Sequence, residues 1–318
     1  MPAAATGPLP EGGLAVTTVE LENVSRWYGN VVAVNDISMT LEPGVTGLLG
    51  PNGAGKTTVL HMMAGFLSPS RGTVTIDGGS TWRNPAIYRR LGLVAEREAV
   101  HGFLTAREFV RASARMHKLP DPKAAADRAL GLVEMTDAAD RRIETYSKGM
   151  RQRTRVAAAL VHDPQVLLLD EPFNGMDPRQ RMHMMGLLHD LGDRGHTILF
   201  SSHILEEVEQ VSGTVQVIVA GRLAASGDYR KIRRLMTNRP HVFALQSSDD
   251  RRLAVALIAE KSVSGVEIDH AGLTVRASDY GSFTRALPRI AIGEGIRLRK
   301  LLPSDESLES VFSYLLEA

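Results

Sequence analysis

The stretch GPNGAGKTT at residues 50–58 decides the fold of this chain. It has the spacing of a glycine, four further residues and then Gly-Lys-Ser/Thr, which is typical of loops that bind phosphate groups. The apolar residues 45–49 before it predict a buried strand, and residues 58–66 after it predict a helix. This strand, loop and helix in sequence favour a phosphate site over an incidental lysine in a glycine-rich loop.

Each residue type in the loop suits a phosphate ligand. Glycines let backbone N–H groups turn toward phosphate oxygens, and the following helix points the positive end of its dipole at the same place. Lys56 can reach the β- and γ-phosphates, and the Thr57 hydroxyl can ligate Mg²⁺. The candidate residues of the loop are Gly50, Pro51, Asn52, Gly53, Ala54, Gly55, Lys56, Thr57 and Thr58.

A second signal lies at Asp170 and Glu171, directly after the aliphatic residues 166–169. Such a run predicts a parallel strand buried on both faces, and ligands gather at the carboxyl ends of these strands. Asp170 is therefore placed to hold Mg²⁺, and Glu171 to deprotonate a water that attacks the γ-phosphorus. The alternative is a pair of acids in a polar loop, and the phosphate loop upstream disfavours it.

Composition limits the class of protein. The chain has 318 residues, 43% of them hydrophobic, which is enough for one large or two medium domains. It contains no cysteine, so disulfides and thiolate metal sites are excluded. With 37 basic and 36 acidic residues the net charge is +1, and we expect no nucleic-acid partner. No apolar run approaches the length that spans a bilayer, and residues 1–15 are expected to be a flexible lead-in without a secretion signal.

The order of elements predicts an α/β domain over residues 16–235. Short β pieces within residues 16–41 predict antiparallel strands, residues 72–78 predict a strand with turns at both ends, and residues 91–96 predict another strand. A helical region follows at about residues 97–162, including a helix over 148–162. Strand 166–169, helix 178–191, strand 197–201, helix 205–211 and strand 215–220 then alternate, which indicates a parallel sheet with right-handed crossovers.

Residues 236–318 predict a small accessory domain. Their pattern is β-α-β-β-α-β, closed by a helix over 306–316, and this order indicates a ferredoxin-like α+β sandwich. The basic residues Arg230, Lys231, Arg233 and Arg234 precede this domain. They predict a solvated helix face, with contact to lipid headgroups as the alternative.

Taken together, the motifs resemble those of the ATP-binding subunits of ABC transporters. The phosphate loop, the strand ending in Asp170-Glu171, the turn at residues 174–177, the segment SKGMRQ at residues 147–152 and His203 all match that family. The resemblance covers residues 16–234 and implies a P-loop ATPase fold with an antiparallel β subdomain, a parallel-sheet nucleotide core and a helical subdomain. Within the family, the chain is similar to ABC-2-type exporter and drug-efflux ATP-binding subunits.

The resemblance also implies roles for individual residues. Tyr28 would stack on adenine, whereas periodicity alone leaves a core or turn aromatic equally open. Lys56, Glu171 and His203 would be catalytic, with Glu171 as the general base and His203 in contact with the γ-phosphate. Residues Ser147 and Gly149 would bind the γ-phosphate of ATP held by the opposite subunit, and Asp177 would link the two sites.

The partners implied are a second copy of the ATP-binding subunit and an integral membrane permease. The chain would then act with ATP and Mg²⁺ as a peripheral protein on the cytoplasmic side of the membrane, hydrolysing ATP for export. A soluble ABC ATPase that acts on nucleic acid or the ribosome, or as a regulator, is the alternative. The single phosphate loop and the lack of sustained heptads before residue 147 disfavour the first of these.

Three positions depart from the family pattern. Glu96 stands where the family usually has a glutamine, and its carboxylate is expected to ligate Mg²⁺ or water, with a solvated loop acid paired to Arg97 as the alternative. Lys148 and Met150 replace a glycine and a glutamine of the usual Leu-Ser-Gly-Gly-Gln segment. Because Ser147 and Gly149 are retained, we expect activity to survive; Lys148 would either approach the partner's ATP or point to solvent.

Overall fold

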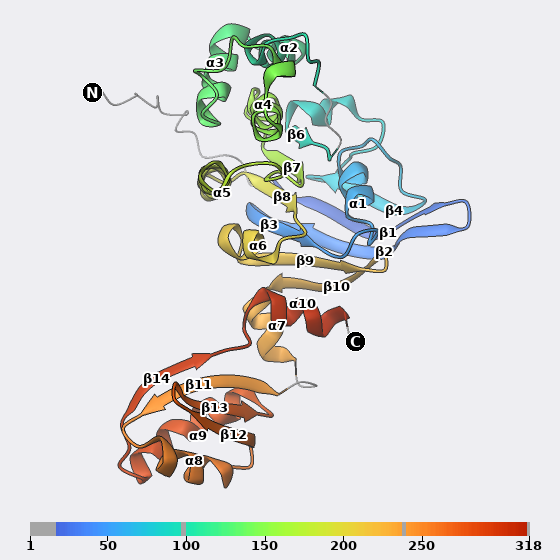
Figure 1. The fold of residues 1–318 in the computed structure, drawn as a ribbon. Helices are drawn as coiled ribbons and strands as arrows, with labels where there is room; N and C mark the ends of the chain where they lie inside the picture. The colour runs from blue at the N-terminus through green and yellow to red at the C-terminus, as the bar shows by residue number, and fades with distance from the viewer. Residues whose placement is uncertain (1–16, 97–99, 237–239, 317–318) are drawn as a thin grey trace. The chain divides into compact units, whose positions relative to one another are not determined.

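The first strands of the chain form an antiparallel sheet in the computed structural model, which describes residues 17–96, 100–236 and 240–316 (Figure 1). The predicted lead-in over residues 1–15 and the expected partner Arg97 lie outside these residues. The sheet has the order β2-β1-β4-β5, and β1 is antiparallel to both β2 and β4. Its strands are β1 (Val19–Tyr28), β2 (Val31–Leu41), β4 (Arg71–Ile76) and β5 (Gly79–Ser80).

A second sheet forms the centre of the nucleotide core. Its order is β10-β9-β3-β8-β7-β6, and β3 runs parallel to β8 and β9, while β7 runs parallel to β6 and β8. Every residue of β7 and β8 is buried, which explains their apolar runs, VLLL at residues 166–169 and ILF at residues 198–200. The predicted parallel sheet is confirmed for β3 (Gly44–Leu49), β6 (Leu91–Val94), β7 (Val166–Asp170), β8 (Thr197–Ser201) and β9 (Thr214–Val219), and β10 (Arg222–Asp228) lies at the edge next to β9.

Strands β3, β7 and β8 of this sheet are followed by helices α1 (Lys56–Met63), α5 (Pro178–Asp193) and α6 (Leu205–Val211), respectively. Helix α1 begins at Lys56 and not at residue 58 as predicted, because the last glycine of the loop is its N-cap. It ends earlier than predicted because Gly65 has φ 68°. That left-handed conformation ends a helix and suits glycine best.

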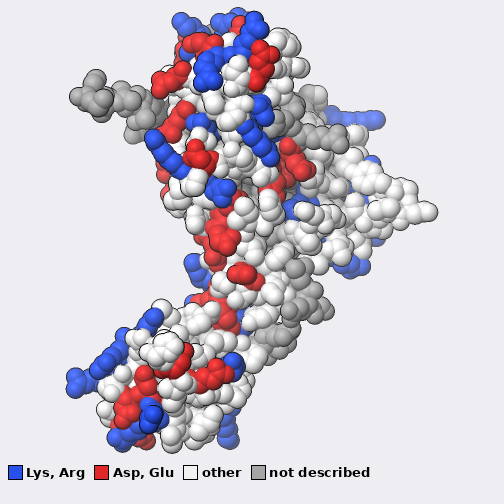
Figure 2. All heavy atoms as spheres, in the orientation of Figure 1, with Lys and Arg blue, Asp and Glu red and all other residues white. Residues whose placement is uncertain are grey.

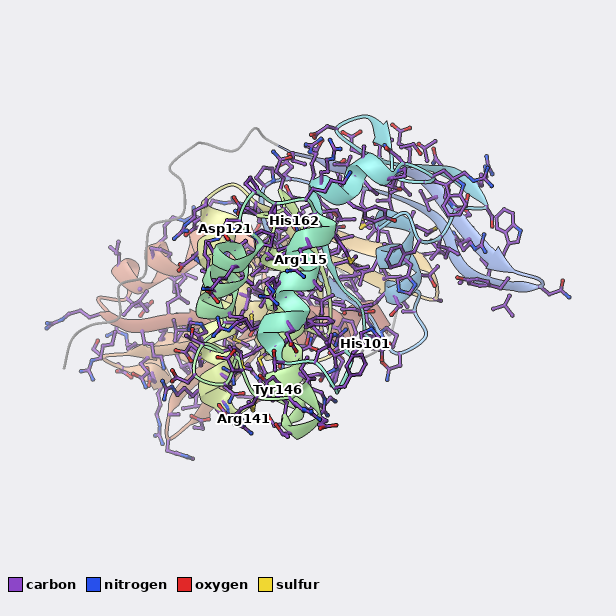
Figure 3. All side chains as sticks on the ribbon, turned by 90° about the horizontal axis from the view of Figure 1, so that it is seen from above. His101, Arg115, Asp121, Arg141, Tyr146 and His162 are labelled. Carbon is purple, nitrogen blue, oxygen red and sulfur yellow. The ribbon has the colours of Figure 1, made fainter. Side chains whose placement is uncertain are left out.

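A helical region lies between β6 and β7, and Figure 3 views it from above. Its helices α2 (Ala106–Met116), α3 (Pro122–Leu132) and α4 (Lys148–Leu160) pack against one another, and a short 3-10 turn at Ile143–Thr145 precedes α4; another, at Pro85–Arg89, lies before β6. Local signals start each helix. Thr105 and Glu108 form a capping box at α2, and Asp121 caps α3 one residue before a proline.

The chain divides into two compact units, Met1–Ser226 and Gly227–Ala318. The second unit contains a four-stranded sheet of order β12-β13-β11-β14 with antiparallel neighbours, which is a split β-α-β arrangement. Phe243, Leu253 and Phe283 lie in its core. Its elements are α7 (Tyr229–Leu235), β11 (His241–Ser247), α8 (Asp250–Ile258), β12 (Val263–Asp269), β13 (Gly272–Ala277), α9 (Tyr280–Gly293), β14 (Leu298–Pro303) and α10 (Leu308–Leu316).

The predicted solvated face of the basic residues in α7 is wrong for Arg233. This side chain is fully buried, and its guanidinium pairs with Asp305 and donates to the Pro240 carbonyl at 2.8 Å. The guanidinium carbon also lies 5.0 Å from the centre of the Tyr314 ring in α10. Helix α7 therefore belongs to the second unit, which begins at Gly227 and not at residue 236.

Basic and acidic side chains lie next to one another over each unit on the face drawn in Figure 2. In the part of the chain that the structure describes, none of the helices has the length and apolar character needed to cross a bilayer.

Candidate functional site

The loop at residues 50–58 connects β3 to α1, and its glycines are required by conformation and by space. Gly53 and Gly55 have φ 80° and 106°, which only glycine adopts at low cost. A Cβ atom on Gly50 would lie 2.2 Å from the Ile218 carbonyl oxygen, and one on Gly55 would lie 2.5 Å from that of Ala33. Side chains at these positions would therefore push the loop away from its neighbouring strands.

Lys56 lies at the first position of α1 and is 8% exposed. Its Nζ donates to the carbonyl oxygens of Gly50 at 2.7 Å and Pro51 at 3.2 Å, so the ammonium closes the loop on itself. Burial lowers the pKa of Lys56, while the carboxylates of Glu171, Asp170 and Glu96 oppose that shift. The loop therefore presents a cation and a helix N-terminus at one point, an arrangement that binds anions.

The Thr57 hydroxyl faces Asp170 at the end of β7, and its Oγ1 lies 2.8 Å from Asp170 Oδ2. Ser201 holds the other carboxylate oxygen, since its hydroxyl donates to Asp170 Oδ1 at 2.5 Å. Asp170 and Ser201 are register partners on adjacent parallel strands. A hydroxyl and a fixed carboxylate at hydrogen-bond distance are oxygen ligands of the type that Mg²⁺ prefers.

Glu171 is held by three neighbours in a backbone conformation that is rare outside glycine, with φ 52°. Its N–H donates to Ser201 Oγ at 3.0 Å, its carbonyl accepts from Gln152 Nε2 at 3.3 Å, and its Oε2 accepts from His203 Nδ1 at 2.8 Å. Burial raises the pKa of Glu171, and the His203 hydrogen bond opposes the shift. A carboxylate with a raised pKa is a better general base.

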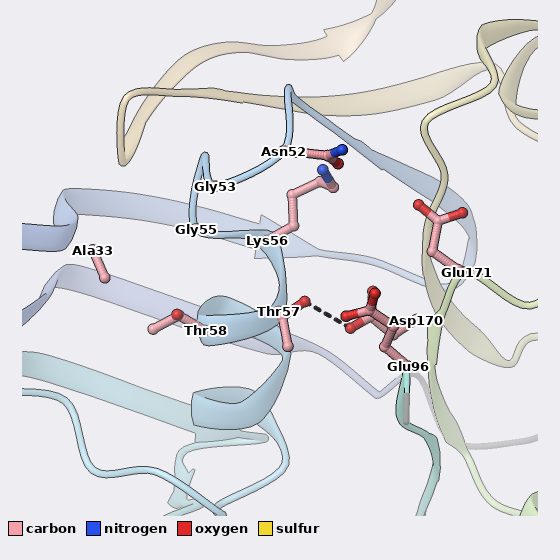
Figure 4. Close-up of a pocket in the computed structure, with 10 residues that line it drawn as sticks. All are labelled: Ala33, Asn52, Gly53, Gly55, Lys56, Thr57, Thr58, Glu96, Asp170 and Glu171. Atoms are coloured by element: carbon pink, nitrogen blue, oxygen red, sulfur yellow. Dashed lines mark hydrogen bonds between the residues drawn. The ribbon is translucent and has the colours of Figure 1, made fainter. Parts of the chain in front are cut away.

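These groups surround a cavity of about 320 Å³, and Figure 4 shows Lys56 and Thr57 on one side of it with the three carboxylates across from them. That volume is in the range of small-molecule sites. The residues that line it are Ala33, Asn52, Gly53, Gly55, Lys56, Thr57, Thr58, Glu96, Asp170 and Glu171. All were candidates from the sequence except Ala33, a small strand residue whose carbonyl packs against Gly55.

Ser147, Gly149 and Asp177 do not line this cavity. Ser147 and Asp177 are exposed N-caps of α4 and α5, and their side chains accept the N–H groups of Met150 at 3.2 Å and Gln180 at 2.9 Å. A Cβ atom on Gly149 would lie 2.7 Å from the carbonyl oxygen of Gly175, so the start of α4 packs closely against the turn before α5.

Tyr28 ends β1 and is 48% exposed, so it is not a core aromatic. The guanidinium carbon of Arg26 lies 4.8 Å from the centre of its ring. His203 is also outside the cavity lining, and it contacts the site through Glu171.

Sequence reasoning missed Ser201, Gln152 and Arg155 as residues of the site. Arg155 donates to Gln152 Oε1 at 2.6 Å and to the carbonyl of Ala95, next to Glu96. No local pattern marks the contacts of Ser201 with Asp170, Gln152 with Glu171 and Arg155 with Ala95, because each joins elements that are far apart in the sequence.

Comparison with known proteins agrees with this geometry. A family model described as ABC transporter matches residues 34–174. The bacitracin transport ATP-binding protein BcrA of Bacillus licheniformis is 32% identical over 94% of this chain and 97% of its own length. The chain belongs to the ABC transporter ATP-binding proteins.

Two further comparisons describe the relatives of this ABC ATPase. Nod factor export ATP-binding protein I of Rhizobium leguminosarum bv. viciae is 36% identical over 69% of the chain and 71% of its own length. A solved ATP-binding subunit of an ABC transporter superposes with a TM-score of 0.63 at 27% identity, over 68% of the chain and 92% of its own.

The family and the fold class predicted from the sequence are thereby confirmed. So is the similarity to ATP-binding subunits of exporters. This ABC ATPase binds ATP, and it hydrolyses ATP to drive transport.

Proposed function

We propose that two copies of this ABC ATPase close around two Mg²⁺·ATP and thereby drive export by a separate membrane permease. The observation that carries the proposal is the position of Ser147, Gly149 and Asp177, which match the family motifs yet lie outside the chain's own cavity. The phosphate loop leaves one side of the γ-phosphate without donors. The N-terminus of α4 from a second copy supplies donors of the right kind there.

Within each copy, the loop residues Gly50, Pro51, Asn52, Gly53, Ala54, Gly55 and Thr58 surround the phosphates, and Lys56 neutralises their charge. The exposed ring of Tyr28 stacks on adenine. The oxygen atoms of Thr57, Asp170 and Glu96 fit Mg²⁺, which, when bound, draws charge from the β- and γ-phosphates.

Hydrolysis is assigned to Glu171 and His203. A water oxygen forms a bond to the γ-phosphorus, the bond from that phosphorus to the bridging oxygen of ADP breaks, and the water proton passes to the Glu171 carboxylate. His203 holds that carboxylate through the 2.8 Å hydrogen bond and contacts the γ-phosphate. Loss of the γ-phosphate, which bridges the two copies, weakens the dimer.

Glu96 supplies a carboxylate where the family usually has an amide. It faces the same cavity as Asp170 and Glu171, so this site holds three acidic side chains. The added negative charge strengthens the attraction for a divalent cation and makes binding of free ATP less favourable than binding of the metal complex.

Export and the membrane partner are supported by the relatives. Their names include Nod factor export, bacitracin transport and daunorubicin resistance. We therefore place the protein at the cytoplasmic side of the cell membrane, attached through its permease.

The test is whether Glu171→Gln accumulates a dimer with Mg²⁺·ATP, because the amide keeps the shape of the site but cannot accept the water proton. Light scattering after size exclusion measures the mass. The matched control is Glu171→Gln combined with Gly149→Val, whose side chain meets the Gly175 carbonyl at the start of α4. A monomer for Glu171→Gln at saturating ATP, or equal dimer in both variants, contradicts the proposal. If affinity purification of the protein from membranes recovers ribosomes or DNA in place of a membrane protein, the transport role is contradicted.

A further inference from the structure

Arg155 connects the two segments that carry Glu96 and Glu171, and nothing in the family motifs assigns it a role. It lies in α4, outside the nucleotide cavity, and is 8% exposed. We propose that Arg155 is a positioning residue for ATP hydrolysis, which holds Glu171 through Gln152 and the Glu96 segment through Ala95. The inference rests on the proposed role of Glu171 as general base.

The contacts form a continuous path across the site. One guanidinium nitrogen of Arg155 donates to the Ala95 carbonyl, which belongs to the peptide that leads into Glu96. Another donates to Gln152 Oε1 at 2.6 Å, and Gln152 Nε2 donates to the Glu171 carbonyl at 3.3 Å. A single planar guanidinium therefore fixes backbone on two sides of the cavity. A lysine ammonium lacks the fork of donors needed to reach both acceptors in the same way.

The backbone of Glu171 needs such support. Its φ of 52° costs free energy in a residue with a side chain, and such conformations persist only where surrounding contacts hold them. Ser201 holds the N–H side of the residue and Gln152 holds the carbonyl side. Without Arg155, Gln152 loses the partner of its Oε1 atom, and the carbonyl side of Glu171 can relax away from the attacking water.

A neighbouring arginine provides a control for the effect of removing a buried charge. Arg153 lies in the same helix and is 7% exposed. Its guanidinium donates to the carbonyls of Val133 at 3.1 Å and Glu134 at 2.9 Å, within the helical region. Loss of either arginine removes buried charge-assisted hydrogen bonds, and only Arg155 bonds to segments that carry the acidic residues of the site.

The experiment compares Arg155→Ala with Arg153→Ala in the full-length protein. The turnover number is measured at saturating Mg²⁺·ATP, the Kd for ATP by equilibrium binding, and the Tm by thermal unfolding. We expect both variants to have a lower Tm. Arg155→Ala is expected to lower kcat by about 10- to 100-fold with a Kd within about threefold of the parent, because a misplaced base slows chemistry and leaves the phosphate loop intact.

Two further variants keep the test independent of folding. Gln152→Met retains the size of the side chain and leaves Arg155 in place, and it should reproduce the loss of kcat. Arg155→Lys retains the charge and should restore kcat only in part. The losses of kcat in Arg155→Ala and Gln152→Met should combine to less than their product in the double variant, since both substitutions release the Glu171 carbonyl.

Equal kcat values for Arg155→Ala and Arg153→Ala overturn the inference. It is also overturned if the loss of activity comes from a higher Kd for ATP, or if the two losses of kcat combine fully in the double variant. Glu171→Gln is measured alongside. Parent-like turnover in Glu171→Gln overturns the proposed function and the role of Arg155 together. If Glu171→Gln loses turnover but Arg155→Ala and Arg153→Ala have equal kcat values, only the role of Arg155 is overturned.

Discussion

Acid should destabilise the first unit through His162, the histidine labelled near helix α2 in Figure 3. This ring stacks on His117 with centroids 3.6 Å apart and planes at 9°. Its Nε2–H donates to the Leu91 carbonyl at 3.2 Å. Burial and the neighbouring His117 lower the pKa of His162 to about 4, against the smaller opposing effect of the Leu91 hydrogen bond. The ring therefore stays neutral in the folded protein well below its ordinary range.

The sign and size follow from proton linkage. A depressed pKa means that the unfolded chain binds the proton more readily, so stability is present above the ordinary pKa of 6.5 and is lost as pH falls toward about 4. Between about pH 7 and pH 5 a shift of this size corresponds to about 2 kcal/mol. Because part of the ring contacts solvent, we expect a loss of about 1–2 kcal/mol.

The assay is urea unfolding followed by tryptophan fluorescence at the two pH values. Both tryptophans of the chain, Trp27 and Trp82, lie in the first unit, so the signal reports on that unit alone. His162→Gln should lose less stability on acidification than the parent. His189→Gln is the matched control, since the side chain of His189 is 59% exposed, and it should behave as the parent does. Equal acid losses for His162→Gln and the parent would refute the reasoning.

Two other perturbations have definite outcomes. Lys56→Ala should lose most ATP hydrolysis and weaken ATP binding, because it removes the cation that closes the loop; equilibrium binding and phosphate release measure both, and parent-like values would count against the site. Arg233→Met should destabilise the second unit by about 3–5 kcal/mol, since it leaves Asp305 buried without its charge partner. Replacing Asp305 by Leu in the same variant should recover part of that loss, as measured by denaturant unfolding of residues 227–318, and no recovery would argue against the pairing.

The parts of the site that the sequence predicts are those with local signals. The phosphate loop is a continuous motif, and Asp170 and Glu171 follow a run of aliphatic residues that is typical of a strand buried on both faces. The parallel sheet follows from the alternation of such runs with amphipathic helices. Ala33, Ser201 and Arg155 carry no such signal, because their roles arise from strands and helices that meet only in the folded chain.

At Arg233 a local pattern is present but predicts the wrong environment. Beside Arg230, Lys231 and Arg234 it has the composition of a solvated face, yet its carboxylate partner lies 72 residues further along the chain. Charge patterns predict exposure only where no distant acid can reach the charge. Ser147, Gly149 and Asp177, which we propose to act across a dimer interface, are a related case, since a motif marks them but one copy of the chain does not bring them to its own cavity.

The pairing of α7 with α10 sets the smallest fragment of the second unit that can be excised. Because Arg233 and Arg234 contact Asp305 and Glu306, the start and the end of this unit hold each other. A fragment trimmed to residues 240–303 would lack α7 and α10, so it would lose both ion pairs together with the buried side chains Tyr229, Leu308 and Val311. Expression boundaries at residue 227 and after α10 keep these ion pairs and both helices.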